Sequence, residues 1–172
     1  MNPLLTELPV VNLRPGELFV AREPTLISTL LGSCVAVTVY CPVQKFGAMC
    51  HGVMPANHQP EMADDDCFRF VDSSITYMVD VLSGQQGVNP VRLNAKIFGG
   101  ADVLDVTPHC LKKNKSIGSQ NIIAARNTLS KLGLPIVAEK VGGVKGYKLF
   151  FYSYSGEVLL RHISRSSNRD SK

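Results

Sequence analysis

Short runs of hydrophobic and β-branched residues recur along the first third of the chain, and each is closed by turn-forming residues. The run at residues 35–40 reads Val-Ala-Val-Thr-Val-Tyr and ends at Cys41-Pro42, a pattern typical of a strand. Another run ends at Pro55. The pattern therefore predicts four strands in this part of the chain, at residues 17–21, 25–30, 35–40 and 46–54.

Two later segments repeat their apolar residues at helical spacing. The first helix is predicted to begin in the acidic residues 64–66, because carboxylates cap free N–H groups and favour the positive end of the helix dipole. Glycine at position 84 ends it. The second helix is predicted at residues 119–132, because Gly133 can terminate a helix and Pro135 prevents its continuation. The apolar face of the first helix is formed by Phe68, Val71, Ile75, Met78, Val79 and Leu82.

The order of these elements predicts an α+β fold. Further strands are expected at residues 92–98, 136–141, 147–154 and 157–163, the last two joined as a hairpin at Ser155-Gly156. Seven or eight strands and two long helices are then unevenly interleaved, which does not fit a regular βαβ repeat.

The chain length fits a single domain with short extensions. Residues 1–14 are expected to form an extended N-terminal arm, residues 15–163 the folded domain, and residues 164–172, rich in Ser and Arg, a mobile tail.

Composition and charge exclude several classes of function. Hydrophobic residues make up 45% of the chain and charged residues 19%, as in an ordinary globular protein. The formal charge of +4 is mild and its basic residues are scattered, which argues against a nucleic-acid-binding protein. No run of about 18 apolar residues exists to insert into a membrane, and the N-terminus lacks the regions of a signal peptide. A cytoplasmic location is therefore expected.

Cysteine usage agrees with that compartment. The chain has five cysteines, an odd number, and no Cys-x-x-Cys pair. This pattern favours neither a disulfide framework nor a structural zinc site.

Gly32-Ser33-Cys34 is the most informative stretch for chemistry, because it joins a turn to a strongly apolar strand. Gly32 leaves room for a substrate to approach the main chain, and N–H groups near such a turn, around Gly32–Cys34, are natural oxyanion donors. Cys34 is then a candidate nucleophile. The alternative is a free cysteine that acts as a small hydrophobic core residue.

A thiol nucleophile needs a base, and His51 is the best placed of four histidines. It lies on a predicted inner strand that is otherwise almost devoid of polar side chains, so it is either a hydrogen-bonded core histidine or a functional one. Alternation places Cys50 on the opposite face, which argues against a shared metal. In a hairpin of strands 35–40 and 46–54, Cys34 and His51 come close together.

Other polar residues are weaker candidates. Ser28 and Thr29 precede the turn, and the hydroxyl of either residue is a candidate to hydrogen-bond the imidazole as the third member of a triad. The alternative is that both are ordinary strand hydroxyls without a catalytic role. Lys96 and the pair Gly99-Gly100 are candidates for lining a cleft, although an edge lysine fits Lys96 as well.

These stretches together resemble the CheD family of chemoreceptor glutamine deamidases. The resemblance is carried in order by residues 28–37, 47–55, 96–101 and 117–121, and by Gly142-Gly143, and it spans roughly residues 14 to 163. It implies a β-sandwich-like arrangement of mixed sheets flanked by helices, similar to cysteine hydrolases of the cytotoxic necrotizing factor type.

The resemblance also implies an activity and a set of site residues. Cys34 would be the nucleophile, a thiolate stabilised by protonated His51, and Ser28 would stand where the family usually has threonine. The expected reaction converts glutamines of methyl-accepting chemotaxis receptors to glutamate without a metal or organic cofactor, and extends to glutamyl methyl esters. Proteins similar to CheD commonly bind a CheC-type phosphatase, so the alternative is a non-catalytic adaptor for receptors or for that phosphatase.

Overall fold

The computed structural model describes residues 7–56, 64–84, 87–103 and 115–163. Within these residues the chain forms nine strands and two α-helices, together with two short 3₁₀ helices. The elements in chain order are β1 (Val10–Asn12), β2 (Leu18–Val20), β3 (Leu26–Leu31), β4 (Val35–Cys41), β5 (Phe46–Gly52), η2 (Asp64–Arg69), α1 (Val71–Gly84), η3 (Pro90–Arg92), β6 (Asn94–Gly99), α2 (Ile117–Lys131), β7 (Ile136–Val141), β8 (Tyr147–Tyr152) and β9 (Val158–His162).

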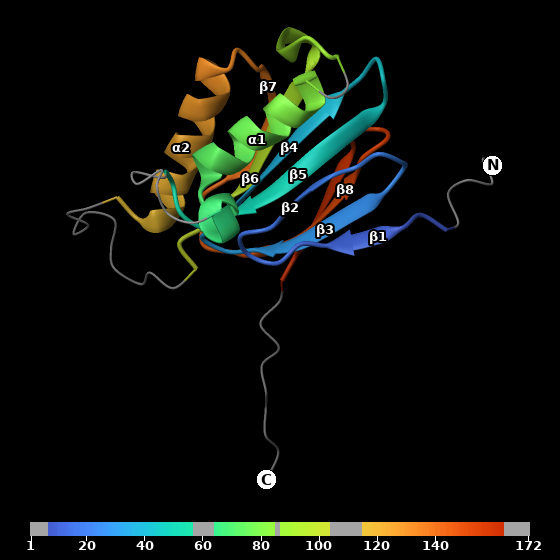
Figure 1. The fold of residues 1–172 in the computed structure, drawn as a ribbon. Coiled ribbons are helices and arrows are strands. Elements are labelled where there is room, and N and C mark those ends of the chain that lie inside the picture. Colours follow the sequence, from blue (N-terminus) through green and yellow to red (C-terminus); the bar gives the residue numbers. More distant parts are fainter. Residues whose placement is uncertain (1–6, 57–63, 85–86, 104–114, 164–172) are drawn as a thin grey trace.

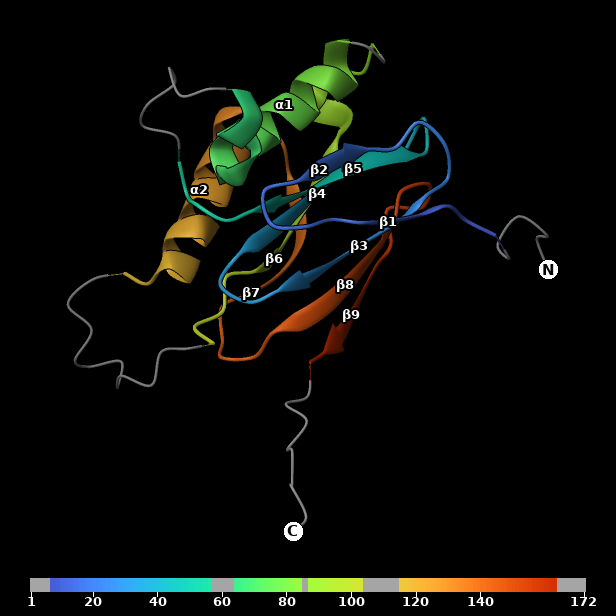
Figure 2. The ribbon, with the colours of Figure 1, turned by 60° about the horizontal axis from the view of Figure 1, so that its bottom comes forward.

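The strands form two mixed sheets. The smaller has the order β1-β3-β8-β9, and the larger has the order β2-β5-β4-β6-β7. Helices α1 and α2 cover the outer face of the five-stranded sheet, and the four-stranded sheet lies against its inner face (Figures 1 and 2). The α+β class, with two mixed sheets and two main helices, is confirmed.

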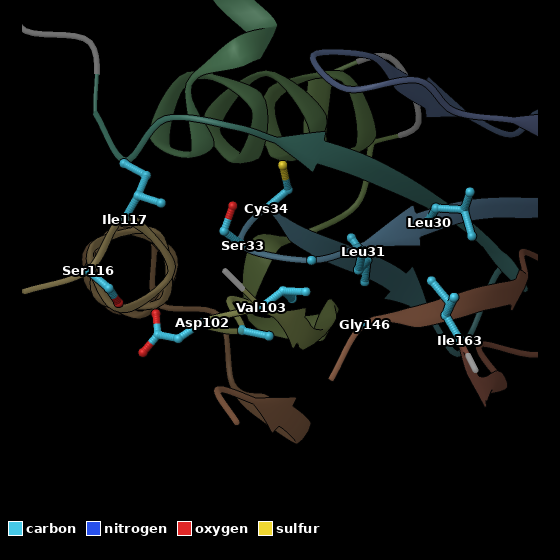
Figure 3. Close-up of a pocket in the computed structure, with 12 residues that line it drawn as sticks. Leu30, Leu31, Ser33, Cys34, Asp102, Val103, Ser116, Ile117, Gly146 and Ile163 are labelled. Carbon is cyan, nitrogen blue, oxygen red and sulfur yellow. The ribbon is translucent and has the colours of Figure 1, made fainter. Parts of the chain in front are cut away.

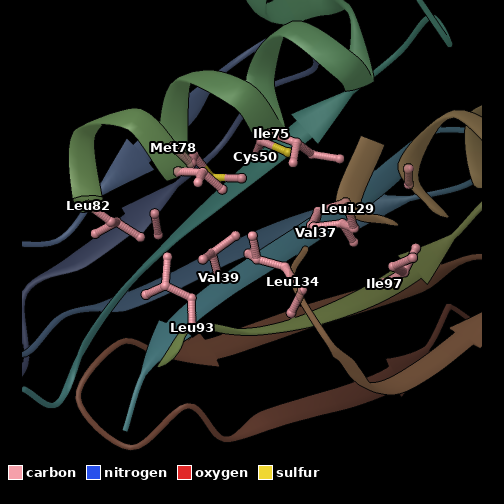
Figure 4. Close-up of a cluster of buried hydrophobic side chains, with 14 of the residues drawn as sticks. Val37, Val39, Cys50, Ile75, Met78, Leu82, Leu93, Ile97, Leu129 and Leu134 are labelled. Carbon is pink, nitrogen blue, oxygen red and sulfur yellow. The ribbon is translucent and has the colours of Figure 1, made fainter. Parts of the chain in front are cut away.

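Strand alternation divides the core into two layers. Odd-numbered residues of β4, such as Val37 and Val39, pack with Cys50 against the two helices (Figure 4). The neighbouring positions Ala36 and Met49 face the four-stranded sheet, where they pack with Ile27. His51 occurs on this second face, two residues after Met49, so the inter-sheet layer surrounds the imidazole.

Most observed boundaries lie within two residues of the sequence-based ones, and larger differences occur at two places. Residues 64–69 form the 3₁₀ helix η2, and the α-helix begins only at Val71. A carboxylate cluster marks the start of a helical segment without distinguishing the two helix types. In the predicted N-terminal arm, residues Val10–Asn12 form β1, which pairs in parallel with β3. The hairpin of β8 and β9 is confirmed. The predicted tail lies outside the described residues.

Candidate active site

The loop at residues 32–34 carries the chain from the four-stranded sheet to the five-stranded sheet. Each of its three backbone carbonyl groups accepts a hydrogen bond. The N–H of Ala101 donates to the carbonyl of Gly32 and the N–H of Gly100 to that of Cys34, each at 2.8 Å. The side chain of Asn121 donates to the carbonyl of Ser33 at 3.1 Å. The backbone of the loop is therefore fixed from one side.

Gly99 and Gly100 make this contact possible. Both have positive φ values, of 99° and 67°, which other residues adopt only with strain. A Cβ atom at Gly99 would also collide with the carbonyl oxygen of Cys34. The double glycine thus supports the loop from behind and is absent from the lining of the neighbouring cavity. The predicted place of the pair in a cleft stays a prediction.

The backbone N–H groups of the loop, unlike its carbonyl groups, make few hydrogen bonds to the backbone. Within the described part of the chain, the N–H groups of Ser33 and Cys34 have no backbone acceptor. Because the carbonyls point to the β6–α2 side, both N–H groups face the opposite side, where that of Cys34 interacts with its own sulfur. The oxyanion role expected for the turn from the sequence stays a prediction.

His51 is buried on β5, and one of its ring nitrogens is held by Thr29 on β3. The Oγ1 of Thr29 lies 2.6 Å from the Nδ1 of His51. The same hydroxyl donates its proton to the carbonyl of Leu13 at 2.9 Å. A hydroxyl has one proton to donate, so Thr29 accepts from the N–H at Nδ1. The neutral ring then carries its lone pair on Nε2, the atom that a general base requires.

Ser28 is not in contact with His51. Its Oγ donates to the side-chain oxygen of Asn12, on the neighbouring strand β1. Adjacent residues of a strand point to opposite faces, so only one of Ser28 and Thr29 can reach the imidazole. The prediction that Ser28 orients the ring is wrong by one residue, and Thr29 occupies that position.

Cys34 directly precedes β4, at the position that strand alternation places diagonal to His51. Ala36 is directly opposite His51 in the β4–β5 ladder, and Cys34 precedes Ala36 by two residues. Diagonal neighbours are separated by about 7–8 Å, within reach of long side chains. The Nε2 of His51 is buried and has no hydrogen-bond partner among the described residues. The register thus puts Cys34 and the free imidazole nitrogen toward the same end of the β4–β5 pair.

Burial governs the charge state of both groups. It lowers the pKa of His51 to about 4, although the carboxylate of Glu17 acts in the opposite direction. It also raises the pKa of the Cys34 thiol, partly offset by the backbone N–H of the same residue. Both shifts favour the uncharged forms of the two groups, a neutral thiol and a neutral imidazole. Desolvation therefore opposes the expected pair of thiolate and protonated imidazole, because it penalises each charge.

A cavity of about 600 Å³ opens beside Cys34 (Figure 3). Its walls come from the end of β3, the 32–34 loop, the residues after β6, the start of α2 and the segments flanking β8 and β9. The side chains are mostly apolar, with Asp102 and Ser116 among the polar exceptions. The lining residues are Leu30, Leu31, Gly32, Ser33, Cys34, Ala101, Asp102, Val103, Ser116, Ile117, Gly146 and Ile163.

Lys96 lies elsewhere. Its Nζ donates to the carbonyl of Gly156, in the turn between β8 and β9, at 2.7 Å. Lys96 is also absent from the residues that line the cavity. Its side chain ties the two sheets together, and its predicted place in a cleft stays a prediction.

The other thiols and imidazoles offer weaker chemistry. Cys50 is fully buried against the helices, and burial raises the pKa of its thiol to about 12. The ring of His162 stacks at 4.6 Å on that of Tyr147. His58, His109 and Cys110 lie outside the described residues. Across the described ranges, no three His, Cys, Asp or Glu side chains converge on a possible metal position.

Two contributors to the site were not found from the sequence. The carbonyl of Leu13 fixes the hydroxyl of Thr29, and Asn121 holds the 32–34 loop. A backbone carbonyl leaves no signal in a sequence. Asn121 does leave one, because an amide on the buried face of an amphipathic helix requires a polar partner.

Comparison with known sequences identifies the class of protein that carries this arrangement. The family profile described as "CheD chemotactic sensory transduction" matches residues 53–162. A protein of Geobacter sulfurreducens, named "Probable chemoreceptor glutamine deamidase CheD 2", is 41% identical over 93% of this chain and 94% of its own length. A relative from Maridesulfovibrio salexigens, with the same name but for the number, is 33% identical over 90% and 92%. The chain belongs to the CheD family.

Similarity to solved structures is lower. The hypothetical protein YfiH of Bacillus licheniformis is 16% identical with a TM-score of 0.48, covering 72% of this chain and 49% of its own. The family assignment therefore rests on the sequence relatives. In the part of the chain that the structure describes, no helix has the length and apolar character needed to cross a membrane.

Proposed function

We propose that the protein deamidates glutamine side chains of methyl-accepting chemotaxis receptors, releasing ammonia and leaving glutamate. The names of its relatives support the reaction and the substrate. The observation that carries the proposal for this chain is the contact of Thr29 with Nδ1 of His51, which leaves Nε2 free on the face that bears Cys34. Glutamine hydrolysis needs a nucleophile and a base in this relation.

The first half of the proposed reaction forms a thioester. Nε2 of His51 takes the proton of the Cys34 thiol as the sulfur attacks the amide carbon of the glutamine side chain. The N–H groups of Ser33 and Cys34 stabilise the resulting oxyanion. Protonated His51 then gives its proton to the departing nitrogen, so the carbon–nitrogen bond breaks and ammonia leaves.

The second half restores the thiol. Neutral His51 takes a proton from a water molecule, whose oxygen attacks the thioester carbon. The carbon–sulfur bond breaks, the sulfur recovers its proton from the imidazole, and the product is a glutamate side chain. Each turnover therefore adds one negative charge to the receptor. A glutamyl methyl ester would pass through the same thioester with methanol as the leaving group.

The residues that line the cavity beside Cys34 determine which receptor glutamines the site accepts. Leu30 and Ile163 are exposed at 58% and 46%, and both line the cavity beside Cys34. Exposed apolar side chains around a reactive group favour an apolar partner. The preferred substrate is thus a glutamine whose neighbours on the receptor surface are small or apolar.

Further aspects of the expected function belong to the proposal. The reaction would take place in the cytoplasm, and the site would resemble that of hydrolases of the cytotoxic necrotizing factor type. Binding to a CheC-type phosphatase would coexist with catalysis. A non-catalytic adaptor is the second candidate, but that role does not require the contact between Thr29 and His51.

Incubation of the protein with receptor cytoplasmic fragments tests the reaction. We expect released ammonia, and a mass gain on specific glutamine peptides equal to replacement of an amide by a carboxyl group. A matched sample without the protein controls for spontaneous deamidation. Stable binding of the fragments with no mass gain would support the adaptor instead.

The pH dependence of the reaction follows from the burial of His51. The base must be neutral, and its pKa of about 4 means that it binds a proton only as the pH falls toward that value. We expect kcat/KM to stay level from about pH 7 to pH 5 and to fall below it, whereas an unperturbed histidine would lose activity from about pH 6.5. Circular dichroism over the same range separates this effect from unfolding. An acidic limb centred near pH 6.5 would contradict the neutral resting pair.

A further inference from the structure

Asn121 bridges the two segments that carry the candidate nucleophile and base. It lies in the second turn of α2 and is completely buried. Its Nδ2 donates to the carbonyl of Ser33 at 3.1 Å and to the carbonyl of Val53 at 3.0 Å. Ser33 directly precedes Cys34, and Val53 follows His51 by two residues. Carbonyl oxygens only accept, so the amide nitrogen must face them.

The two contacts lie just beyond the end of the sheet. The ladder between β4 and β5 closes at the pair Val35 and Gly52, after which the two chains separate. Asn121 crosses the gap one step further on, from Ser33 to Val53. Its side chain thus replaces the backbone hydrogen bonds that the ladder no longer supplies.

The main chain of α2 lies very close to the main chain that follows β6, and this approach brings Asn121 near its two acceptors. A Cβ atom at Gly118 would lie 2.5 Å from the carbonyl oxygen of Gly100, so only glycine fits there. Gly118 precedes Asn121 by three residues, about one turn. The approach of α2 to the loop after β6 therefore brings the amide within reach of both carbonyls.

The second polar atom of the side chain shows that this arrangement is not optimised for stability. The Oδ1 of Asn121 is buried with no hydrogen-bond partner among the described residues. A buried acceptor without a partner is destabilising. An apolar residue would avoid that penalty, but it would leave two carbonyls without their donor. The amide group instead holds the segments around Ser33 and Val53 in place by donating to both carbonyls.

We infer that Asn121 is a positioning residue that fixes the separation of Cys34 and His51 through the carbonyls of Ser33 and Val53. The inference rests on the proposed deamidation, in which the imidazole must reach the thiol. Reacting groups lose rate steeply when they are displaced, by about a hundredfold for a displacement of 1 Å. Asn121 does not itself touch the substrate.

The test compares Asn121→Ala and Asn121→Asp with Asn127→Ala, an exposed asparagine of the same helix. Aspartate keeps the shape of the side chain but loses both donors. We expect kcat to fall by about 10- to 100-fold in both Asn121 variants with KM unchanged. Hydrogen exchange in the peptides around residues 32–35 and 51–54 should rise, while α1 stays protected. Asn127→Ala should match the wild-type protein.

Several results would overturn the inference. Wild-type kcat in Asn121→Asp would show that side-chain shape, not donation, matters. A rise in KM alone would place the residue in substrate binding, and loss of folding in both variants would make it a general requirement of the fold. The exchange measurement needs no substrate, so a protein without deamidase activity would refute the proposed function while the bridge itself is still tested.

Discussion

Replacing Cys34 by alanine is expected to abolish deamidation and leave the fold intact. The thiol lies at the mouth of a cavity, half-exposed, so its removal leaves little unfilled space in the core. Without the sulfur no thioester forms, and loss of the nucleophile in comparable hydrolases costs about 10⁴-fold or more. The measurement is the rate of ammonia release from a receptor fragment, with the melting temperature recorded in parallel.

Cys67 supplies the matched control, because it is also free and only partly buried. Cys67→Ala should keep the wild-type rate. Cys50→Ala should keep most activity as well, with a small loss of stability, since the thiol packs against the helices on the opposite face. Activity retained in Cys34→Ala and lost in Cys50→Ala would show that the nucleophile has been assigned to the wrong cysteine.

Thr29→Val is expected to lower kcat by about ten- to a thousandfold. Valine keeps the β-branched shape, but His51 loses the acceptor for its Nδ1–H, and a buried donor without a partner costs about 1–3 kcal/mol. The ring can then move its proton to Nε2, where the lone pair is needed. Fitting kcat and KM separately measures the effect, and nitrogen NMR of the imidazole reports which tautomer is present.

Ser28→Ala is the companion variant one residue away. Its hydroxyl bonds Asn12 on β1 and does not contact the imidazole, so we expect a change in kcat of less than about threefold. Thr29→Ser should keep most activity, because the hydroxyl is retained. A severe loss in Ser28→Ala with an unchanged Thr29→Val would restore the assignment made by counting back from Cys34.

The sequence-based choice of Ser28 over Thr29 was wrong because a sequence motif does not specify which face of a strand a side chain occupies. Resemblance fixed a distance along the chain from Cys34, whereas the contact depends on which face of β3 is turned to the other sheet. Alternation in the sequence did not choose the face, because Leu26 and Leu30 are as apolar as Ile27 and Leu31, and only the burial seen in the structure does. Ile27 and Leu31 are fully or almost fully buried, Leu30 is exposed, and Thr29 shares the parity of the buried pair.

The approach of Cys34 to His51, in contrast, was predictable from the sequence. The pairing of the strands at 35–40 and 46–54 follows from their short connection, and it places Cys34 near His51 without any family knowledge. The charge state was not within reach, because it depends on desolvation by the second sheet. Strand β1 has only three residues, too few for a periodic pattern, yet it positions the carbonyl that Thr29 uses.

The pairing of β3 has a consequence for the order in which the molecule is made. Thr29 lies beside Leu149 in the β3–β8 ladder, so the strand that orients His51 pairs with one synthesised 120 residues later. Such distant pairings form late, because the intervening chain must first be ordered. A nascent polypeptide still lacking its last strands would carry Cys34, Thr29 and His51 without the sheet that aligns them. Alignment of these side chains would then follow the synthesis of β8, and chains terminated before β8 would not hold them in register.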